Sequence, residues 1–467
     1  MVDGRLGLPN KNIDWFIFIS SIALVVLVCV PLALFPGQGR ELLDRVFGYV
    51  TDEFGIVYVL MSIATMVFLG YLAFGRFGHV LLGSPGKKPD FSTFSWAAML
   101  FCGGIGTSVL YWGTVEWAHY YTAPPFEVLP RSDDALRWSV SYPIFHWGFV
   151  GWGLYCLPAI AIGYAYHVRK VPSLRLSAAC APVLGKSASG PLGRFIDTLF
   201  IVGLLGAAST GIGLAIPLIS ACLTEMFGVA PSFSLNVAVI AVITALFAVS
   251  VYVGLEKGIK RLSNVNVTLA FLLILFVLAV GPTAFILELG TESIGLMLQN
   301  FLLMSTATDV FSSGTFVESW TVFYWAWWLA LGPFMGMFIT KISGGRTIRQ
   351  VVLGTLGYGT LGCTLFFVVL GSYAVFLEMN DIVDVVDLVG RDEAPLAIVA
   401  VLRSLPFSGL VLAFFTVVCL IFAATTYDSA SYTLASSATR SLPVGEHPER
   451  WNRVFWAFTI GVLPITL

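Results

Sequence analysis

Charged side chains are scarce in this sequence. Of its 467 residues, only 11% are Asp, Glu, Lys or Arg and 57% are hydrophobic, whereas a soluble globular domain has roughly 25% charged residues. The net charge of −2 provides no basic surface for a phosphate backbone, which excludes a nucleic-acid binder. This composition also excludes a soluble enzyme and a disordered chain, and a polytopic membrane protein remains.

Metal-binding and catalytic motifs are also lacking. The seven cysteines form no CxxC pair, which argues against disulfides and zinc. The five histidines are dispersed, and no HExxH, P-loop or GxSxG sequence occurs. Glu116 and His119 could form an acid–base pair near the outer end of a helix, but no nucleophile or metal set accompanies them. We therefore expect neither an enzyme nor a cofactor.

Long apolar runs dominate the chain. A helix that crosses a bilayer needs about 20 apolar residues. The sequence predicts eleven such spans: 15–35, 55–75, 93–121, 138–166, 195–224, 232–254, 264–288, 319–340, 348–378, 407–437 and 452–467. The first is too long for the core of a signal peptide. An all-α polytopic membrane protein in a lipid bilayer is the predicted fold class.

The distribution of Lys and Arg predicts the orientation. Nineteen of the 25 lie in alternate connections that begin with the N-terminal segment, which includes Arg5 and Lys11. Cytoplasmic connections carry the excess of Lys and Arg, so we expect a cytoplasmic N-terminus. Unpaired cysteines and the lack of a targeting peptide favour the inner (cytoplasmic) membrane of a bacterium.

Two segments resemble each other at an offset of 213 residues: Val109–Gly113 reads VLYWG, and Val322–Ala326 reads VFYWA. The same offset places three later spans of the first half on spans of the second half. A repeat of five helices inserts its second copy upside down, which is typical of secondary transporters. A chance match in an eleven-span protein is the alternative.

The repeat predicts how the chain is divided. A cytoplasmic N-terminus with two peripheral helices would occupy 1–92, the first repeat 93–288, an external connection 289–318 and the inverted second repeat 319–467. The fifth helix of the second repeat would lie beyond the last residue. We therefore expect the chain to lack roughly 35 or more C-terminal residues.

Glycines mark a candidate break in the first helix of the first repeat. The sequence Cys102–Ser108 (CGGIGTS) lies near its middle, and glycine is unfavourable in a helix interior. Transporters of this kind bind substrate and ion at such a break, where backbone groups are freed. Close packing of helices through small residues is the alternative interpretation.

Aromatic residues are concentrated on two predicted helices. Ser319–Trp328 contains four tryptophans, more than an interfacial belt needs. Of these, Trp320 and Trp327 are seven residues apart and are expected to share a face. The span 138–166 contributes a second group: His146, Trp147, Trp152 and Tyr155. Rings from two helices can enclose a quaternary ammonium group, and ordinary aromatic packing is the alternative.

Polar residues inside apolar helices are further candidates. Thr425 and Thr426 precede Asp428 in a polar run, and their hydroxyls would suit a small hard cation such as sodium. Hydrogen bonds to carbonyls of their own helix would explain the same residues. Asn264 and Asn266 alone are typical of a helix start.

With these residues in view, the chain resembles the betaine/carnitine/choline transporter (BCCT) family. The run Trp320–Trp328 is the most specific part of the resemblance. Further matches are Phe91–Trp96, Trp112–Glu116, Phe145–Trp147, Gly254–Gly258, Gly345–Thr347 and Asp428–Ser431. The resemblance implies twelve helices, two of them before a LeuT-like five-plus-five inverted repeat, and a homotrimer.

The resemblance also implies a site for a small onium substrate: glycine betaine, choline, carnitine or dimethylsulfoniopropionate. His119 stands where carnitine exchangers of the family place a tyrosine that contacts the substrate, and Leu331 replaces an aromatic hydroxyl residue. An aromatic box and a methionine would hold the substrate: Trp147, Trp152, Tyr155, Trp320, Trp327, Trp328 and Met335.

The coupling ion follows from the same resemblance. Sodium-independent exchangers of the family carry an arginine where Asn266 stands. Sodium-coupled members use two adjacent hydroxyl residues, here Thr425 and Thr426, with backbone carbonyls near Cys102 and Ile105. We therefore expect sodium symport of an onium compound by alternating access. A sodium-independent exchanger of carnitine-like compounds is the alternative.

Overall fold

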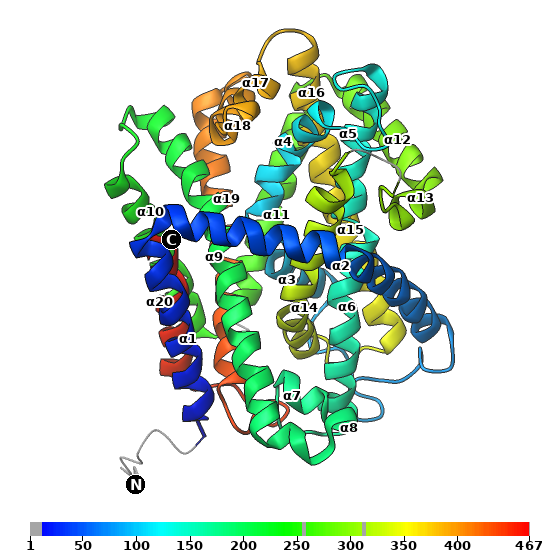
Figure 1. The fold of residues 1–467 in the computed structure, drawn as a ribbon, viewed down its shortest axis with the longest axis vertical. Coiled ribbons are helices and arrows are strands. Elements are labelled where there is room, and N and C mark those ends of the chain that lie inside the picture. Colours follow the sequence, from blue (N-terminus) through cyan, green and yellow to red (C-terminus); the bar gives the residue numbers. More distant parts are fainter. Residues whose placement is uncertain (1–11, 255–257, 311–313, 467) are drawn as a thin grey trace.

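The structure, a computed structural model, describes residues 12–254, 258–310 and 314–466 (Figure 1). Nine helices in this part of the chain have the length and composition to cross a bilayer, and a pair of helices bent by 61° makes up to ten. This all-helical arrangement confirms the predicted fold class. The middle of the Gly254–Gly258 motif, and Arg5 and Lys11 of the N-terminal segment, lie outside the described residues.

The first two helices precede the rest of the bundle. Helix α1 (Trp15–Leu34) agrees with the predicted span. Helix α2 (Pro36–Phe74) has 39 residues and begins well before the predicted residue 55. Its first half contains many charged residues, so no apolar run marks it in the sequence. Pro36 is tolerated at its start because the first turn of a helix needs no backbone donor. In Figure 1, α2 runs across the front of the bundle.

The helices of the first half follow the predicted spans with two interruptions. One separates α3 from α4, and the other lies at Trp147–Gly148 inside the predicted span 138–166. The elements are α3 (Thr93–Gly104), α4 (Ser108–Thr122), α5 (Asp133–His146), α6 (Phe149–Gly163), η1 (Tyr164–Val168), α7 (Leu176–Ala179), α8 (Ala181–Leu184), η2 (Gly185–Ser189), α9 (Pro191–Phe227) and α10 (Phe233–Val253).

The predicted span 264–288 is wrong as a single helix. Helix α11 (Ile259–Val280) ends at Gly281, and α12 (Thr283–Gln299) begins after Pro282. Proline removes a backbone donor and disfavours a helical residue before it, which explains the division. Helices α12 and α13 (Phe301–Thr306) occupy much of the predicted connection 289–318.

The second half resembles the first in its helix lengths. The spans Asp133–Val168, α9 and α10 have 36, 37 and 21 residues, and their counterparts have 32, 30 and 17. The inverted relation of the halves stays a prediction. The elements are η3 (Val317–Val322), α14 (Phe323–Ile342), α15 (Ile348–Phe366), η4 (Phe367–Gly371), α16 (Ser372–Met379), α17 (Val385–Gly390), α18 (Ala394–Arg403), α19 (Ser408–Ser437) and α20 (Arg450–Thr466).

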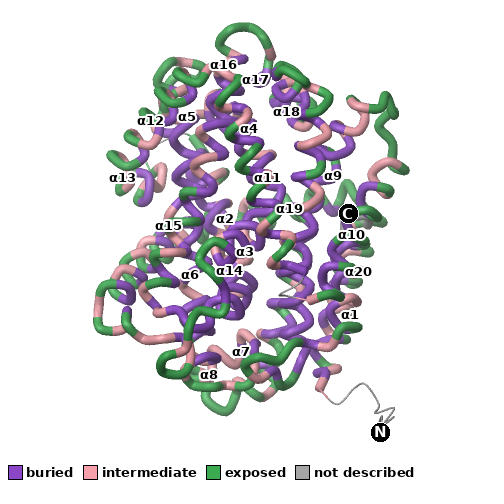
Figure 2. Tube along the Cα trace, turned by 180° about the vertical axis from the view of Figure 1, so that it is seen from behind, coloured by how far each residue is buried: buried purple, intermediate pink, exposed green. Residues whose placement is uncertain are grey.

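Helices α3, α6, α14 and α19 lie in the buried centre of the bundle (Figure 2). Helices α6 and α14 are in close contact because α14 presents glycines to α6. A Cβ atom added at Gly336 would lie 2.9 Å from Pro158 Cβ, and one at Gly332 would lie 3.3 Å from the carbonyl oxygen of Leu154. Small residues allow such close approach between helices in membranes, and this contact positions the aromatic residues of both helices.

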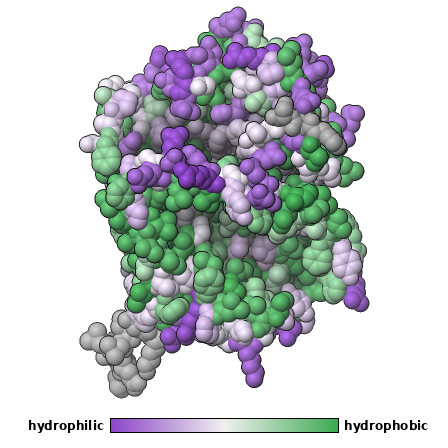
Figure 3. All heavy atoms as spheres, viewed as in Figure 1, coloured by the Kyte–Doolittle hydropathy of each residue, from purple (hydrophilic) through white to green (hydrophobic). Residues whose placement is uncertain are grey.

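The outer surface is suited to lipid. In Figure 3, hydrophobic side chains form a broad band across the face, and hydrophilic side chains gather mainly at its upper end. Leu27, Val67 and Leu275 are more than half exposed. Apolar exposure on this scale is unusual for a soluble monomer and is expected where acyl chains replace water.

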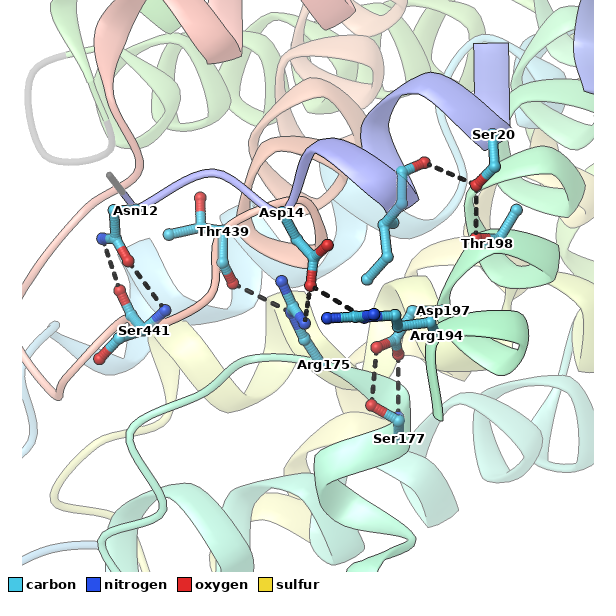
Figure 4. Close-up of polar contacts among 11 residues, drawn as sticks. Asn12, Asp14, Ser20, Arg175, Ser177, Arg194, Asp197, Thr198, Thr439 and Ser441 are labelled. Atoms are coloured by element: carbon cyan, nitrogen blue, oxygen red, sulfur yellow. Dashed lines mark hydrogen bonds and ion pairs between the residues drawn. The ribbon is translucent and has the colours of Figure 1, made fainter. Parts of the chain in front are cut away.

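The segment before α1 is fixed to the end of α19 by polar contacts (Figure 4). The Asn12 side chain donates to the carbonyl oxygen of Ser441 at 2.8 Å and accepts from its amide at 3.0 Å. Asp14 forms an ion pair with Arg175 at 3.2 Å, and Arg175 also donates to the carbonyl oxygen of Thr439. Three distant parts of the chain are thereby joined.

The ion pair of Asp14 and Arg175 is expected to contribute measurably to stability. The two side chains are only 5% and 12% exposed, so Asp14→Ala leaves a largely buried guanidinium unpaired. We expect the free energy of unfolding to fall by about 3 kcal/mol, measured as thermal unfolding in detergent. Arg194 lies 3.8 Å from Asp14 and is 44% exposed, so Arg194→Ala should cost less than about 0.5 kcal/mol. Equal losses in both variants would contradict this assignment.

Candidate functional site

The predicted break in the first helix of repeat one is confirmed. Helix α3 ends at Gly104, α4 begins at Ser108, and the two are bent by 61°. Gly106 has a φ of +61°, a conformation that favours glycine. A Cβ atom there would lie 2.6 Å from Thr426 Oγ1, so close packing applies as well. Both interpretations of the glycines therefore hold.

Two carbonyl groups near the end of α3 accept hydrogen bonds from different helices. The carbonyl oxygen of Cys102 accepts from Thr426 Oγ1 of α19 at 2.8 Å. The carbonyl oxygen of Gly104 accepts from the Tyr155 hydroxyl of α6 at 3.3 Å. The C-terminal end of a helix carries a partial negative charge, equivalent to about −0.5 elementary charge. The break therefore places a cation-attracting group in the interior.

Four of the predicted aromatic residues converge beside this break. The rings of Trp147 and Trp328 are 5.3 Å apart and nearly perpendicular, and Trp147 and Trp327 are 5.9 Å apart. Tyr155 lies 5.0 Å from Trp328, again edge to face. Trp327 and Trp328 stack at 5.7 Å. Ring faces from α6, α14 and the link between α5 and α6 are thus brought together.

Trp152 and Met335 complete this group. The Trp152 ring lies 5.8 Å from that of Tyr155. A Cβ atom added at Gly104 would lie 3.0 Å from Met335 Cε and 3.1 Å from Trp152, so both side chains contact the end of α3. We call this group the aromatic box. It contains the predicted residues except Trp320: Trp147, Trp152, Tyr155, Trp327, Trp328 and Met335.

Trp320 and His119 lie in a neighbouring group. Trp320 is 5.3 Å from His119, 6.1 Å from Trp112 and 4.8 Å from Tyr120. Trp320 belongs to the π-helical element η3, whose wider turn changes the register expected from a seven-residue spacing. The Tyr324 ring joins the two groups, at 6.4 Å from Trp320 and 5.7 Å from Trp147.

Glu116 is the residue whose role the sequence did not reveal. Its side chain is fully buried. The carboxylate accepts hydrogen bonds from Tyr120 at 2.6 Å, Tyr324 at 2.7 Å and the Trp147 indole at 2.8 Å. It thereby fixes one wall of the aromatic box. The sequence signal for this role is an acidic residue, Glu116, in an apolar helix with Tyr120 four positions later.

The two candidate hydroxyls for an ion behave differently. Thr425 Oγ1 donates to carbonyls of its own helix, at 3.0 Å to Ile421 and 2.9 Å to Phe422, which is the alternative reading of that residue. Thr426 makes the contact across to Cys102 described above. Ile105 lies in the break, and its amide donates to the carbonyl oxygen of Phe101 at 3.2 Å.

Asn266 lies behind the break. The interpretation of Asn264 and Asn266 as helix-start residues is wrong, because α11 begins at Ile259. Asn264 donates to Ser95 of α3 at 3.0 Å, and Asn266 lies 3.8 Å from Cys102 Sγ. Asn266 is fully buried, and its Oδ1 atom has no hydrogen-bond partner among the described residues. A buried acceptor of this kind is compatible with a cation nearby.

Asp428 does not join these groups. Its carboxylate accepts from Ser250 of α10, whereas the Thr426 hydroxyl reaches α3. The described residues contain no group of three or more His, Cys, Asp and Glu side chains that could hold a metal ion. The oxygens that meet at the break are neutral carbonyl and hydroxyl groups, and oxygen donors suit hard cations.

Comparisons with known proteins find one matching family and related transporters. The family described as betaine/carnitine/choline family transporter matches residues 16–467. An uncharacterized transporter of Escherichia coli strain K12, YeaV, is 38% identical over 407 residues, which are 87% of this chain and 84% of the relative. A carnitine transporter of Acinetobacter baumannii is 34% identical over 466 residues, covering 99% of this chain and 84% of the relative.

Proposed function

Because the chain belongs to the betaine/carnitine/choline transporter family, we propose that it imports a small onium compound by sodium symport. Carnitine is the first candidate, since the Acinetobacter baumannii relative bears the name carnitine transporter. Glycine betaine, choline and dimethylsulfoniopropionate carry the same kind of cationic head and are the other candidates. The sodium ion is proposed as the coupling ion.

The observation that carries this proposal is the pair of carbonyls near the end of α3. The carbonyl of Cys102 is in contact with Thr426, and that of Gly104 is in contact with Tyr155 of the aromatic box. The two proposed cation sites would then lie two residues apart on one broken helix. This geometry is expected if the binding of an inorganic ion raises the affinity for an organic cation, and the reverse.

The aromatic box would hold the onium head. A cation within about 6 Å of an aromatic ring centre gains roughly 0.5–2 kcal/mol per contact. The rings of Trp147, Tyr155, Trp327 and Trp328 are in contact with one another at 5.0–5.9 Å, so a cation bound beside them would meet more than one ring. The carboxylate of Glu116 lies directly behind Trp147. A carboxylate on the substrate would find the N-terminal end of α4, at Ser108, across the break.

Sodium would be held by the Cys102 carbonyl and the Thr426 hydroxyl, with Asn266 Oδ1, Thr425 and the backbone at Ile105 as further oxygen donors. Binding there would draw α19 against the end of α3. The same end contacts the aromatic box through Tyr155, so an ordered α3 would favour onium binding. The two ligands would then stabilise one access state together, and each would raise the affinity of the other.

The protein is further proposed to act as a homotrimer in the bacterial inner membrane with a cytoplasmic N-terminus. The excess of Lys and Arg in alternate connections supports the orientation, and the family resemblance supports the trimer. Chemical crosslinking in membranes, with accessibility of a residue placed at each end, would test both statements.

Uptake into proteoliposomes tests the proposed function. Symport predicts that an inward sodium gradient drives accumulation of labelled carnitine or betaine and that potassium does not replace sodium. A sodium-independent exchanger would instead require an internal onium compound and would ignore the gradient. Asn266 carries no charge that could replace the ion, which favours symport. Binding without any flux would indicate a sensor and would contradict both transport mechanisms.

A further inference from the structure

A second polar cavity lies far from the aromatic box, at the end of the bundle where α6 and α14 finish. In Figure 1 this is the lower end, near α7 and α8. The cavity has a volume of about 200 Å³. Four separate segments line it, through Lys87 before α3, His167 of η1, Lys341 of α14 and His447 after α19. The proposed transport function uses none of these residues.

Lys341 is a buried cation with neutral partners. Its residue is 9% exposed, and its Nζ atom donates to the carbonyl oxygen of Glu446 at 2.6 Å and to the Tyr166 hydroxyl at 3.4 Å. An ammonium group has three donors, so one remains for the cavity. A buried charge is costly without a counter-ion. Lys341 therefore calls for an anion.

Asp90 and Glu446 both act on Lys341 electrostatically, but neither forms an ion pair with its ammonium group. Asp90 lines the cavity, but it is paired with Lys87 at 2.9 Å. Glu446 follows the lining residue Gly445, and its side chain is exposed to solvent. His447 is in contact with Tyr432 at 2.8 Å. The ammonium of Lys341 is the lining charge that is both buried and without an opposite charge within ion-pair distance.

His167 adds a requirement of its own. Its Nε2 atom lies 2.7 Å from the carbonyl oxygen of Thr340. A carbonyl only accepts, so Nε2 must carry the hydrogen, and in the neutral ring Nδ1 is then an acceptor. His167 is 2% exposed and Nδ1 has no partner among the described residues. A ligand that satisfies this atom has to donate a hydrogen bond.

We propose that this cavity binds a hydroxyl-bearing oxyanion, the class to which hydrogen phosphate and hydrogen carbonate belong. Anionic oxygens accept from Lys341, and the hydroxyl donates to Nδ1 of His167 after a small shift of the ring that opens this buried atom to the cavity. A bound anion joins the segment before α3, the ends of α6 and α14, and the segment after α19. Binding therefore stabilises the folded chain, increasingly as the ligand concentration rises above the dissociation constant.

Calorimetric titration of the purified full chain with inorganic phosphate tests the proposal. Sodium sulfate at the same sodium concentration and ionic strength is the matched ligand, because sulfate has no hydroxyl at neutral pH. We expect phosphate to bind at least about tenfold more tightly than sulfate, the difference made by one hydrogen bond to a buried acceptor. Sulfate binding as tight as phosphate binding would overturn the assignment.

Three variants locate the site. Lys341→Gln should weaken phosphate binding about tenfold or more, since it removes the charged donor. His167→Phe should abolish the preference for phosphate over sulfate, and this variant decides the matter if Lys341→Gln does not fold. Lys88→Gln changes an exposed neighbour outside the cavity and should leave binding unchanged.

The outcomes are separable from those of the transport proposal. Onium binding, followed by tryptophan fluorescence, should be retained in all of these variants. An equal loss in Lys88→Gln would show that phosphate is attracted only by surface charge and would overturn the site. Absence of phosphate binding to the intact chain would overturn it directly.

Discussion

Replacing Trp327 by leucine is expected to raise the dissociation constant for an onium ligand by at least about thirtyfold. The ring stacks on Trp328 and meets Trp147 edge to face, so its removal opens one wall of the aromatic box. A cation–π contact sheltered from water contributes about 2 kcal/mol, which corresponds to roughly thirtyfold in affinity. Equilibrium binding of labelled carnitine or betaine to the purified protein measures the effect.

Trp325→Leu is the matched control for this variant. Trp325 is on the same helix, but its ring contacts Phe145 and His146 rather than the aromatic box. The side chain is fully buried, so the change should lower the thermal stability while the dissociation constant stays within about threefold. Equal losses of affinity in both variants would show that the binding site is not where the aromatic box lies.

Replacing Thr426 by alanine is expected to raise the sodium concentration for half-maximal uptake by about tenfold or more. The Thr426 hydroxyl is the side-chain oxygen that contacts the Cys102 carbonyl at the break. Losing one interaction with a charged partner costs about 1.5–3 kcal/mol. Because the aromatic box is untouched, maximal uptake at saturating sodium should be largely retained. Initial uptake rates in proteoliposomes over a range of sodium concentrations provide the measurement.

Two further substitutions serve as controls for Thr426→Ala. Thr426→Ser keeps the hydroxyl and should restore most of the sodium affinity. Thr425→Ala removes a hydroxyl that is engaged by its own helix, so its effect should be smaller than that of Thr426→Ala. If Thr426→Ala left the sodium dependence of uptake unchanged, the proposed ion site would be wrong.

The break in the first helix could be predicted because the backbone preference of glycine is local and can be read from the sequence. Glycines at 103, 104 and 106 are unfavourable in a helix wherever they occur. The density of tryptophan likewise predicted that Trp147, Trp327 and Trp328 would lie together, and their rings do so. Their mutual angles and distances depend on the close contact of α6 with α14, which only the folded chain shows.

Other parts of the site depend on local geometry that a residue pattern does not carry. The seven-residue spacing of Trp320 and Trp327 implied one face, but the π-helical turn places Trp320 beside His119. Glu116 can be buried because three donors satisfy its carboxylate: Tyr120 of the same helix, Trp147 between α5 and α6, and Tyr324 of α14. Gly281 and Pro282 predict the division of the span 264–288. Mean hydropathy over the span does not reveal it, because one glycine and one proline change that mean very little.

We propose that an inorganic ion and an onium compound bind at the end of α3 and that each raises the affinity of the other. Quenching of tryptophan fluorescence by carnitine, glycine betaine, choline and dimethylsulfoniopropionate, titrated in sodium and again in potassium, tests it most directly. The account predicts that one of these compounds binds at least about tenfold more tightly in sodium, a typical coupling between two sites. Saturable binding with the same dissociation constant in both salts would contradict it.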